Sequence, residues 1–371
     1  MFELYSTLTK QVEAIQPARG GLLRIYSCGP VAPGRPDLGE LRSGLVADLI
    51  RRNAEHRHRL IAATCQGITD AAGRGPDLDA FQADCSALNL RPAEASPRAS
   101  ADPSPIIALI SRLIESGHAY PAPGGSVIFD ALSYPGYGDL CGQDPAGQDP
   151  AGQGETPPHW TLWTGADGDE RAAASPWGAG FPARSAQCAA LSAQNLGEVI
   201  DVHAGGIEMC APHHEHERAV SDTAAGHAVV RQWVHAGRLR FEGAGPDDGP
   251  RLPDLTGRGL DPLALRLALL EHHYREPLDL TAAALDDADR RLREWRGLVA
   301  QWATSPSQAM PASISSEFNA AFDADLDTPA ALGVLGRLAA DGQVRPGAKF
   351  ELFAHADQLL GLDLAREVGR V

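Results

Sequence analysis

Cysteine, histidine and glutamate side chains stand at positions where they could together bind a soft metal ion. His213 and Glu217 are four residues apart in the segment PHHEHE, so a helix there would place both side chains on one face. Two cysteines, Cys28 in YSCGP and Cys188 in SAQCAAL, would complete the four ligands of a Zn²⁺ site. The spacing alone leaves a second interpretation open, in which the histidine lies on the surface and the cysteines are small apolar residues of the core.

The stretch YSCGPVAPGRPDLGELRSG, residues 26–44, has the outline of a nucleotide-binding turn between a strand and a helix. Gly39 would let the backbone approach a ligand closely at the start of that helix. Asp37 and Glu40 flank the glycine, and a carboxylate 4 Å from a phosphate adds roughly 4 kcal/mol of repulsion at an effective dielectric constant of 20. The turn therefore carries charges that oppose phosphate binding.

The composition limits the classes of partner. The 371 residues carry 48 acidic and 32 basic side chains, a net charge of −16, which disfavours extended contact with nucleic acid. Only Lys10 and Lys349 are lysines. The six cysteines are scattered, and no apolar N-terminal run resembles a signal peptide or a membrane span. We therefore expect a cytoplasmic protein with reduced thiols and no membrane partner.

The elements that must position these residues begin with a strand, a helix and a second strand. GLLRIYSC and RLIAAT have strand character, and the apolar residues of the intervening segment 40–57 have helical spacing. This order predicts a parallel α/β sheet with its ligand near the carboxyl ends of the strands. A helix over 104–120 and a strand over 126–132 follow. The tandem repeat GQDPAGQDPAGQG predicts a mobile loop over 141–158.

The second half of the chain first repeats strand character and then becomes helical. GEVIDVHAGG and VRQWVHAGRLRF are expected strands on either side of a histidine-rich helix start. From about Pro262, apolar residues recur at helical spacing. The segments 262–274 and 282–302 and two further segments that end near residue 362 predict a helical bundle.

Segments along nearly the whole chain occur in the same order as in the cysteinyl-tRNA synthetase family, which this chain resembles. It also resembles the mycothiol cysteine ligase, which shares the catalytic core of that family. Besides YSCGP and GITD, the resemblance rests on FDALSYPGYGDL, DVHAGGIEMCAPHHEHE, WVHAGRL, HHYREPLDL and FDADLDTPAAL. It implies a Rossmann-type class I synthetase catalytic domain with a connective insertion, followed by a C-terminal α-helical bundle. The implied boundaries are 1–90 and 186–260 for the two halves of the catalytic domain, 91–185 for the insertion and 261–371 for the bundle. We expect an anticodon-binding domain to be absent.

The resemblance also implies the roles of individual residues. In that family a zinc ion binds the substrate thiol, and the ligands correspond to Cys28, Cys188, His213 and Glu217. Substrate contacts are expected from Gly29, Thr69, Asp70 and Arg184. Nucleotide contacts are expected from Gly39, Gly205, Gly206 and Glu208, the last standing where the family usually has aspartate.

Three motifs depart from the family pattern. The HIGH signature corresponds to residues 37–40, so both histidines are replaced by carboxylates while Gly39 remains. The KMSKS region, RFEGAGPDDGPRLPDLTGRG, has two adjacent aspartates and no lysine, and Arg251 and Arg258 are possible substitutes for the lysines. The family's Trp-His-Ile-Glu-Cys becomes RSAQC, in which Arg184 is either a carboxylate clamp or a solvated surface residue.

Three functions are compatible with this pattern. The first is a tRNA-independent ligase-like enzyme that binds cysteine or a similar thiol amino acid through zinc and joins it to a small amine or carrier. In that case Asp37, Gly39, Glu40 and Arg251 occupy the catalytic motif positions, adenylation is impaired, and the use of ATP and Mg²⁺ is open. The second is a catalytically silent cysteine-binding or regulatory protein. The third is zinc-dependent thiol chemistry that needs no ATP.

Overall fold

The computed structural model describes residues 2–30, 34–71, 76–142, 159–243, 245 and 249–370. The loop expected over 141–158 lies outside these residues except for Cys141 and Gly142. The adjacent aspartates of the expected KMSKS region, Asp247 and Asp248, also lie outside them.

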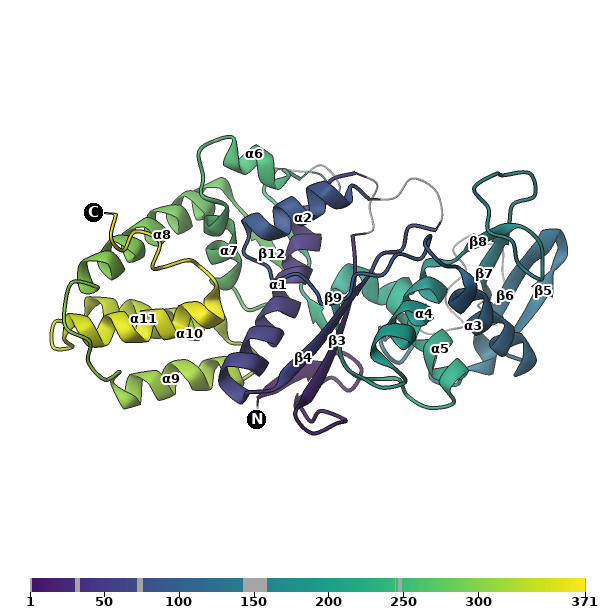
Figure 1. The fold of residues 1–371 in the computed structure, drawn as a ribbon, viewed down its shortest axis with the longest axis horizontal. Coiled ribbons are helices and arrows are strands. Elements are labelled where there is room, and N and C mark those ends of the chain that lie inside the picture. Colours follow the sequence, from purple (N-terminus) through teal and green to yellow (C-terminus); the bar gives the residue numbers. More distant parts are fainter. Residues whose placement is uncertain are drawn as a thin grey trace.

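A parallel four-stranded sheet forms the centre of the molecule, as the sequence predicted (Figure 1). Its strands lie in the order β10 (Val230–Ala236), β9 (Ile200–Gly206), β3 (Leu22–Cys28) and β4 (Ile61–Gly67). Every residue of β9 is buried, as expected for an inner strand covered on both faces. The chain leaves β3 through helix α1 (Leu38–Arg52) to reach β4 on one side, while β9 lies on the other side. The carboxyl ends of β3 and β9 therefore meet at a point where the strand order reverses, which is where ligands bind in such sheets.

An insertion with its own antiparallel sheet separates β4 from β9. The strands of this second sheet are β5 (Ala119–Ala122), β6 (Ser126–Asp130), β7 (His159–Gly165) and β8 (Gly180–Pro182). Helix α3 (Ser104–Glu115) packs against it, and α4 (Arg184–Leu196) and α5 (Glu215–Ala225) lie between the two sheets (Figure 1). Helices α4 and α5 also pack against each other.

Helices at the other end of the molecule form the bundle that the sequence predicted from Pro262 (Figure 1). They are α7 (Pro262–Leu270), α8 (Ala282–Trp302), α9 (Ala312–Asp323), α10 (Thr328–Ala340) and α11 (Pro346–Leu360). The sequence prediction of two helical segments after α8 was wrong, because three follow. The short polar helix α9 was missed because only Phe318 and Phe322 on it are buried.

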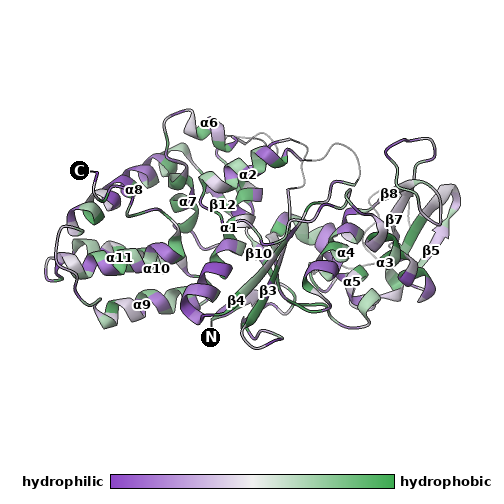
Figure 2. Cartoon of the chain, viewed as in Figure 1, coloured by the Kyte–Doolittle hydropathy of each residue, from purple (hydrophilic) through white to green (hydrophobic). Residues whose placement is uncertain are grey.

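The remaining elements are short and connect these layers. They are β1 (Glu3–Ser6), β2 (Gln11–Ala14), α2 (Leu78–Ala87), β11 (Leu239–Phe241), α6 (Leu252–Thr256) and β12 (Leu278–Leu280). Hydrophobic residues fill the central strands, while the surface helices carry apolar and polar faces (Figure 2). Among the described residues, no helix is long and apolar enough to cross a membrane.

A buried ion-pair network fixes α1 to the bundle. The Asp48 carboxylate on α1 accepts hydrogen bonds from Arg52 (2.8 Å) and from Arg266 on α7 (2.7 Å). Arg266 also donates to the carbonyl oxygen of Leu360 at the end of α11. All three charged side chains are almost completely buried. The helix that follows the first sheet strand is thus held by the bundle as well as by the sheet.

Candidate functional site

The four expected metal ligands, distant in sequence, converge at the carboxyl end of β3. Cys28 is the last residue of that strand, and Cys188 lies on the buried face of α4. His213 lies in the segment Cys210–His214 that leads into α5, and Glu217 lies four residues later in the first turn of α5. Their ligand atoms all lie within 4.8 Å of one another.

The distances between these ligand atoms fit a tetrahedral metal ion. The Cys28 sulfur lies 3.4 Å from the Cys188 sulfur and 3.3 Å from Nε2 of His213. Cys188 and Glu217 each approach the same His213 nitrogen to 3.6 Å. Zinc–ligand bonds of 2.0–2.3 Å imply tetrahedron edges of about 3.3–3.8 Å. Two sulfurs, one imidazole and one carboxylate at these separations can hold Zn²⁺.

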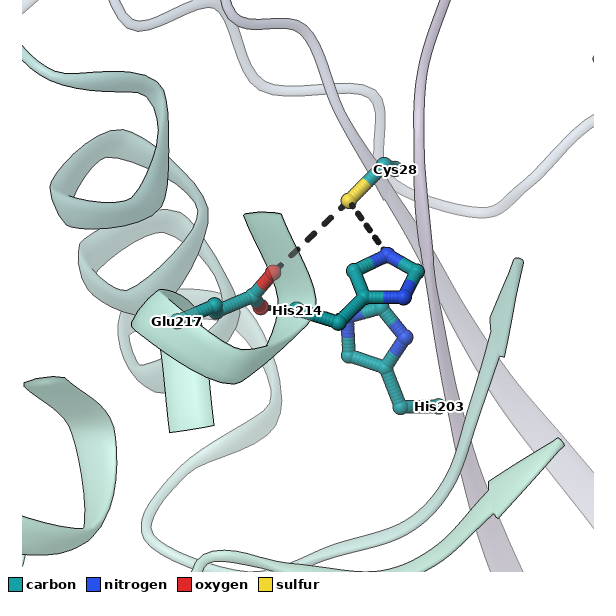
Figure 3. A group of neighbouring side chains, drawn as sticks. All are labelled: Cys28, His203, His214 and Glu217. Atoms are coloured by element: carbon teal, nitrogen blue, oxygen red, sulfur yellow. Dashed lines mark hydrogen bonds and ion pairs between the residues drawn. The ribbon is translucent and has the colours of Figure 1, made fainter. Parts of the chain in front are cut away.

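A second, overlapping set replaces Cys188 and His213 by two further histidines. Figure 3 shows Cys28, His203, His214 and Glu217 as neighbours. The Cys28 sulfur lies 3.7 Å from both His214 Nε2 and Glu217 Oε2. His203 Nε2 lies 3.1 Å from the other Glu217 oxygen. That hydrogen bond suits a residue that orients a ligand rather than one that binds the metal.

His214 is held from behind by a chain of polar side chains. Its Nδ1 lies 2.8 Å from Nε2 of His235, whose Nδ1 lies 2.8 Å from the Thr7 hydroxyl. The sequence analysis did not identify His203, His214 or His235. Their only signal was that histidine recurs in DVHAGG, PHH and WVHAGRL, at strand ends and a helix start.

Burial dominates the electrostatics of this cluster. It raises the pKa of Glu217 to about 8 and lowers the pKa of His203 to about 3. Burial opposes ionisation of Cys188, but its contacts with Cys28 and His213 lower the pKa of Cys188 to about 7. The hydrogen bond with Cys188, together with burial, raises the pKa of Cys28. A bound cation would compensate the negative charges that this apolar site disfavours.

The four residues expected to contact a substrate have different surroundings. A Cβ atom at Gly29 would lie 2.6 Å from a methyl group of Ile68, so glycine permits the close passage of β3 beside the end of β4. The hydroxyl of Thr69 is buried and has no hydrogen-bond partner among the described residues, so a ligand could use it. Arg184 is exposed, and its charge acts on Cys28.

The carboxylate of Asp70 is hydrogen-bonded to residues of the insertion. It accepts hydrogen bonds from Arg98 (2.7 Å) and from both the backbone and the hydroxyl of Ser100 (2.9 and 2.8 Å). Although partial burial opposes the shift, these contacts lower the pKa of Asp70. Asp70 therefore fixes the start of the insertion against the end of β4.

Two residues of the expected nucleotide site, Gly39 and Glu208, line a cavity of about 230 Å³, whereas Gly205 and Gly206 are not among its described lining residues. Asp37, Gly39 and Glu208 form part of its wall. Desolvation and the nearby carboxylate of Asp37 raise the pKa of Glu208. A Cβ atom at Gly206 would meet the Glu208 carboxylate, and one at Gly205 would meet the ring of His214. Both glycines leave room for these side chains.

The acidic residues of this turn cap helix α1. The Asp37 carboxylate accepts from the backbone N–H of Glu40 (2.8 Å), and the Glu40 carboxylate accepts from that of Asp37 (3.1 Å). This reciprocal arrangement is a capping box, which stabilises a helix start. The same N–H groups are those that would otherwise bind a phosphate.

Two arginines that the sequence analysis did not identify supply positive charge to the cavity. Arg238 and Arg240, on either side of the start of β11, line its wall. Within the described ranges, neither guanidinium group has a hydrogen bond or ion pair. Their signal was the alternation RLRF directly after the strand VRQWVHA.

The arginines proposed from the KMSKS region are not among the described lining residues of the cavity. Arg251 precedes α6, and its Nη1 atom is buried without a partner in the described structure. Pro250, its neighbour, lines the cavity. Arg258 is exposed.

The expectation that all six cysteines are reduced was wrong for one pair. Cys141 in the insertion and Cys210 at the start of the histidine-rich segment form a disulfide. Cys28, Cys65, Cys85 and Cys188 are free thiols. Scattered positions in the sequence gave no sign that residues 69 apart would meet.

Comparisons with known proteins agree with this fold. A model of the class I (C) tRNA synthetase catalytic domain matches residues 74–290. The cysteine–tRNA ligase of Methylocella silvestris is 34% identical, with 97% of this chain and 85% of that protein covered. The cysteine–tRNA ligase of Xanthomonas euvesicatoria is 33% identical, with 98% and 84% covered.

Solved class I synthetases share the fold at low sequence identity. Mycobacterium tuberculosis methionyl-tRNA synthetase bound by methionyl-adenylate superimposes with a TM-score of 0.60 at 13% identity, covering 91% of this chain and 89% of that one. Thermus thermophilus arginyl-tRNA synthetase gives a TM-score of 0.55 at 13% identity, covering 96% and 84%.

Proposed function

Because this chain belongs to the cysteine–tRNA ligase family of class I synthetases, we propose that it is a zinc-dependent, ligase-type enzyme that binds cysteine or a closely related thiol amino acid. The observation that carries the proposal is the convergence of Cys28, Cys188, His213 and Glu217 at tetrahedral separations. When bound, zinc supplies affinity for a thiolate, which separates cysteine from serine where size alone would fail.

The chain's own residues prepare this site. Nε2 of His203 lies within hydrogen-bond distance of Glu217 Oε1, and its donation to the ionised group would fix the carboxylate beside the two sulfurs. The unpartnered hydroxyl of Thr69 is available to the polar end of the amino acid. Arg184 is close enough to act electrostatically on Cys28 and is suited to the substrate carboxylate.

The second half of the proposal concerns activation of that carboxylate. The cavity beside α1 carries Asp37 and Glu208 together with Arg238 and Arg240. We propose that the arginines bind the phosphate oxygens of Mg²⁺-ATP and that the acids weaken this binding. Adenylation would then be slower than in relatives with histidines at the HIGH positions, because the capping box occupies N–H groups that could stabilise charge.

The proposed acceptor is a small amine or a carrier rather than tRNA. The net charge of −16 supports this choice, because a phosphate backbone is held mainly by lysine and arginine.

A second candidate is a catalytically silent protein that binds cysteine. The capping box at residues 37–40 favours it, since both donors of the HIGH signature are replaced by acceptors that satisfy their own helix.

Cysteine-dependent exchange of pyrophosphate into ATP separates the two candidates. We expect exchange with cysteine and not with serine, at a low rate that rises in the Asp37→His, Glu40→His double variant. Serine is the control because it has nearly the same size as cysteine but carries a hydroxyl group in place of the thiol. No exchange with saturating cysteine and Mg²⁺-ATP, in either protein, would contradict the ligase and favour the silent binder.

A further inference from the structure

The Cys141–Cys210 disulfide joins two parts of the fold that meet at the metal centre. Cys210 begins the segment Cys210–His214, which carries His213 and leads directly into α5 and Glu217. Cys141 lies in the first half of the insertion, directly before Gly142, the last described residue of that half. The bond therefore fixes the entry to the ligand segment against the insertion.

Noncovalent contacts continue this attachment along α5. The backbone N–H of Cys141 donates to Glu215 (3.0 Å), and the Tyr137 hydroxyl lies 3.0 Å from Nε2 of His216. Farther along, Arg218 donates to the carbonyl oxygen of Gly136 (2.8 Å). These contacts do not depend on the disulfide, so they hold the insertion on α5 when the two thiols are reduced. The disulfide lies beyond the N-terminal end of this series of contacts, next to the segment that carries His213.

The two cysteines differ in access. Cys141 is partly exposed, whereas Cys210 is 4% exposed and packs in the same apolar cluster as Cys188. A small disulfide from solution would meet Cys141 first, and Cys210 would then displace it. Cys28 and Cys188 must stay reduced to bind a metal. A redox site beside them therefore works only if oxidation is confined to Cys141 and Cys210.

We propose that Cys141 and Cys210 form a reversible thiol–disulfide site. Through this site the oxidation state of low-molecular-weight thiols would set how tightly the ligand segment Cys210–His214 and Glu217 bind the metal ion. The thiolate of Cys141 attacks a small disulfide and expels one thiol. The thiolate of Cys210 then attacks the mixed disulfide and expels the second. Two protein thiols and one small disulfide thus give one protein disulfide and two small thiols, with both protons on the latter.

The oxidised form holds zinc more tightly because the ligand segment has fewer alternative conformations to lose. Residues that support metal ligands from outside typically contribute 10–100-fold to metal affinity. We expect the disulfide to act at the low end, slowing zinc loss about tenfold. This inference rests on the proposed zinc site.

The test uses the full-length, zinc-loaded protein, equilibrated with reduced glutathione or with glutathione disulfide. Alkylation of the denatured protein counts reactive thiols, and transfer of zinc to a chromogenic chelator gives the release rate. We expect six reactive thiols in the reduced protein, four in the oxidised protein and about tenfold slower zinc release from the latter. The Cys141→Ser variant should release zinc at the reduced rate under both conditions. Cys85→Ser, which alters a free thiol on α2, should behave like the wild type.

Three results would overturn the proposal. One is equal release rates for the two forms of the wild type although the thiol count shows the bond. Another is oxidation of Cys28 and Cys188 in place of the proposed pair. A third is the absence of zinc from both forms, which would also contradict the proposed metal centre. The thiol count does not depend on zinc, so it would still show whether the disulfide forms. Comparison of the two redox forms of the wild type does not depend on whether a variant folds.

Discussion

Arg238 and Arg240 are the two residues whose charge decides how the cavity beside α1 treats an anion. Both arginines are exposed and line the same cavity of about 230 Å³ as Asp37 and Glu208, and within the described ranges neither guanidinium group has a hydrogen bond or ion pair. An unpaired guanidinium group in a pocket is available to bind phosphate oxygens bidentately.

Removing either arginine should therefore weaken ATP binding. A charge-assisted hydrogen bond contributes about 1.5–3 kcal/mol, so we expect at least about tenfold lower affinity in Arg238→Ala and in Arg240→Ala. Calorimetry with Mg²⁺-ATP at two salt concentrations measures it, and the difference should shrink as salt screens the charges. Arg258→Ala, an exposed arginine outside the cavity, is the control. Wild-type affinity in both cavity variants would exclude a phosphate role for this pair.

At the scale of elements, the start of helix α1 serves its own stability instead of a ligand. The sequence DLGE closes a capping box in which each acidic side chain accepts from the other residue's backbone. This local interaction explains why two carboxylates are stable at a helix start that, in a nucleotide site, would bind an anion.

The Asp37→His, Glu40→His variant should trade helix stability for nucleotide affinity. Loss of the cap costs about 1 kcal/mol of the free energy of unfolding. Asp37 is exposed and Glu40 is partly buried, so solvent and salt partly screen their repulsion of a phosphate, and removing both carboxylates should tighten ATP binding about tenfold. Asp77→Ala removes the matched cap of α2 and controls for stability alone. Equal ATP affinity in the double variant and the wild type would show that these acids do not face the phosphates.

Helix α1 is also where the sheet meets the bundle. The buried pair of Asp48 and Arg266 connects it to α7, and through Arg266 to the end of α11. Removing one partner leaves an uncompensated buried charge, so Asp48→Asn should lower the free energy of unfolding by about 3–5 kcal/mol. Chemical denaturation measures it, and Asp279→Asn on the exposed face of β12 is the matched control.

The acid sensitivity of this pair has a definite sign. Burial alone would raise the pKa of Asp48, but the charges of Arg266 and Arg52 outweigh burial and lower it. The stabilisation is therefore complete above the pKa of aspartate in the unfolded chain, about 3.9, and is lost as the pH falls through the lower folded value. The Asp48→Asn variant should lack this component, and an identical acid dependence in both proteins would contradict it.

At the scale of the whole molecule, the sequence predicted the layers better than it predicted their contacts. Short runs of strand character identified β3, β4 and β9, and the helical spacing of apolar residues identified the long helix α8, because burial selects apolar side chains at these positions. The four metal ligands came from matched motifs, not from spacing. The partner histidines and the disulfide could not be predicted, since they depend on which elements lie side by side.

The acidic surface bears on the acceptor. Because electrostatic binding is strongest at low salt, a gel shift at low ionic strength is the most permissive assay for tRNA. We expect no complex with cysteine tRNA that resists competition by an unrelated tRNA. A specific complex would overturn the small-acceptor proposal and leave the metal centre untouched.

X-ray absorption at the zinc edge tests the metal centre most directly, because it counts the sulfur atoms bound to the ion. The set Cys28, Cys188, His213 and Glu217 predicts two sulfur neighbours in the protein alone, three after saturation with cysteine, and two with serine. A single sulfur neighbour in the protein alone would favour the set shown in Figure 3, with His203 and His214 as ligands. A sulfur count that cysteine does not change would contradict thiol recognition by this site.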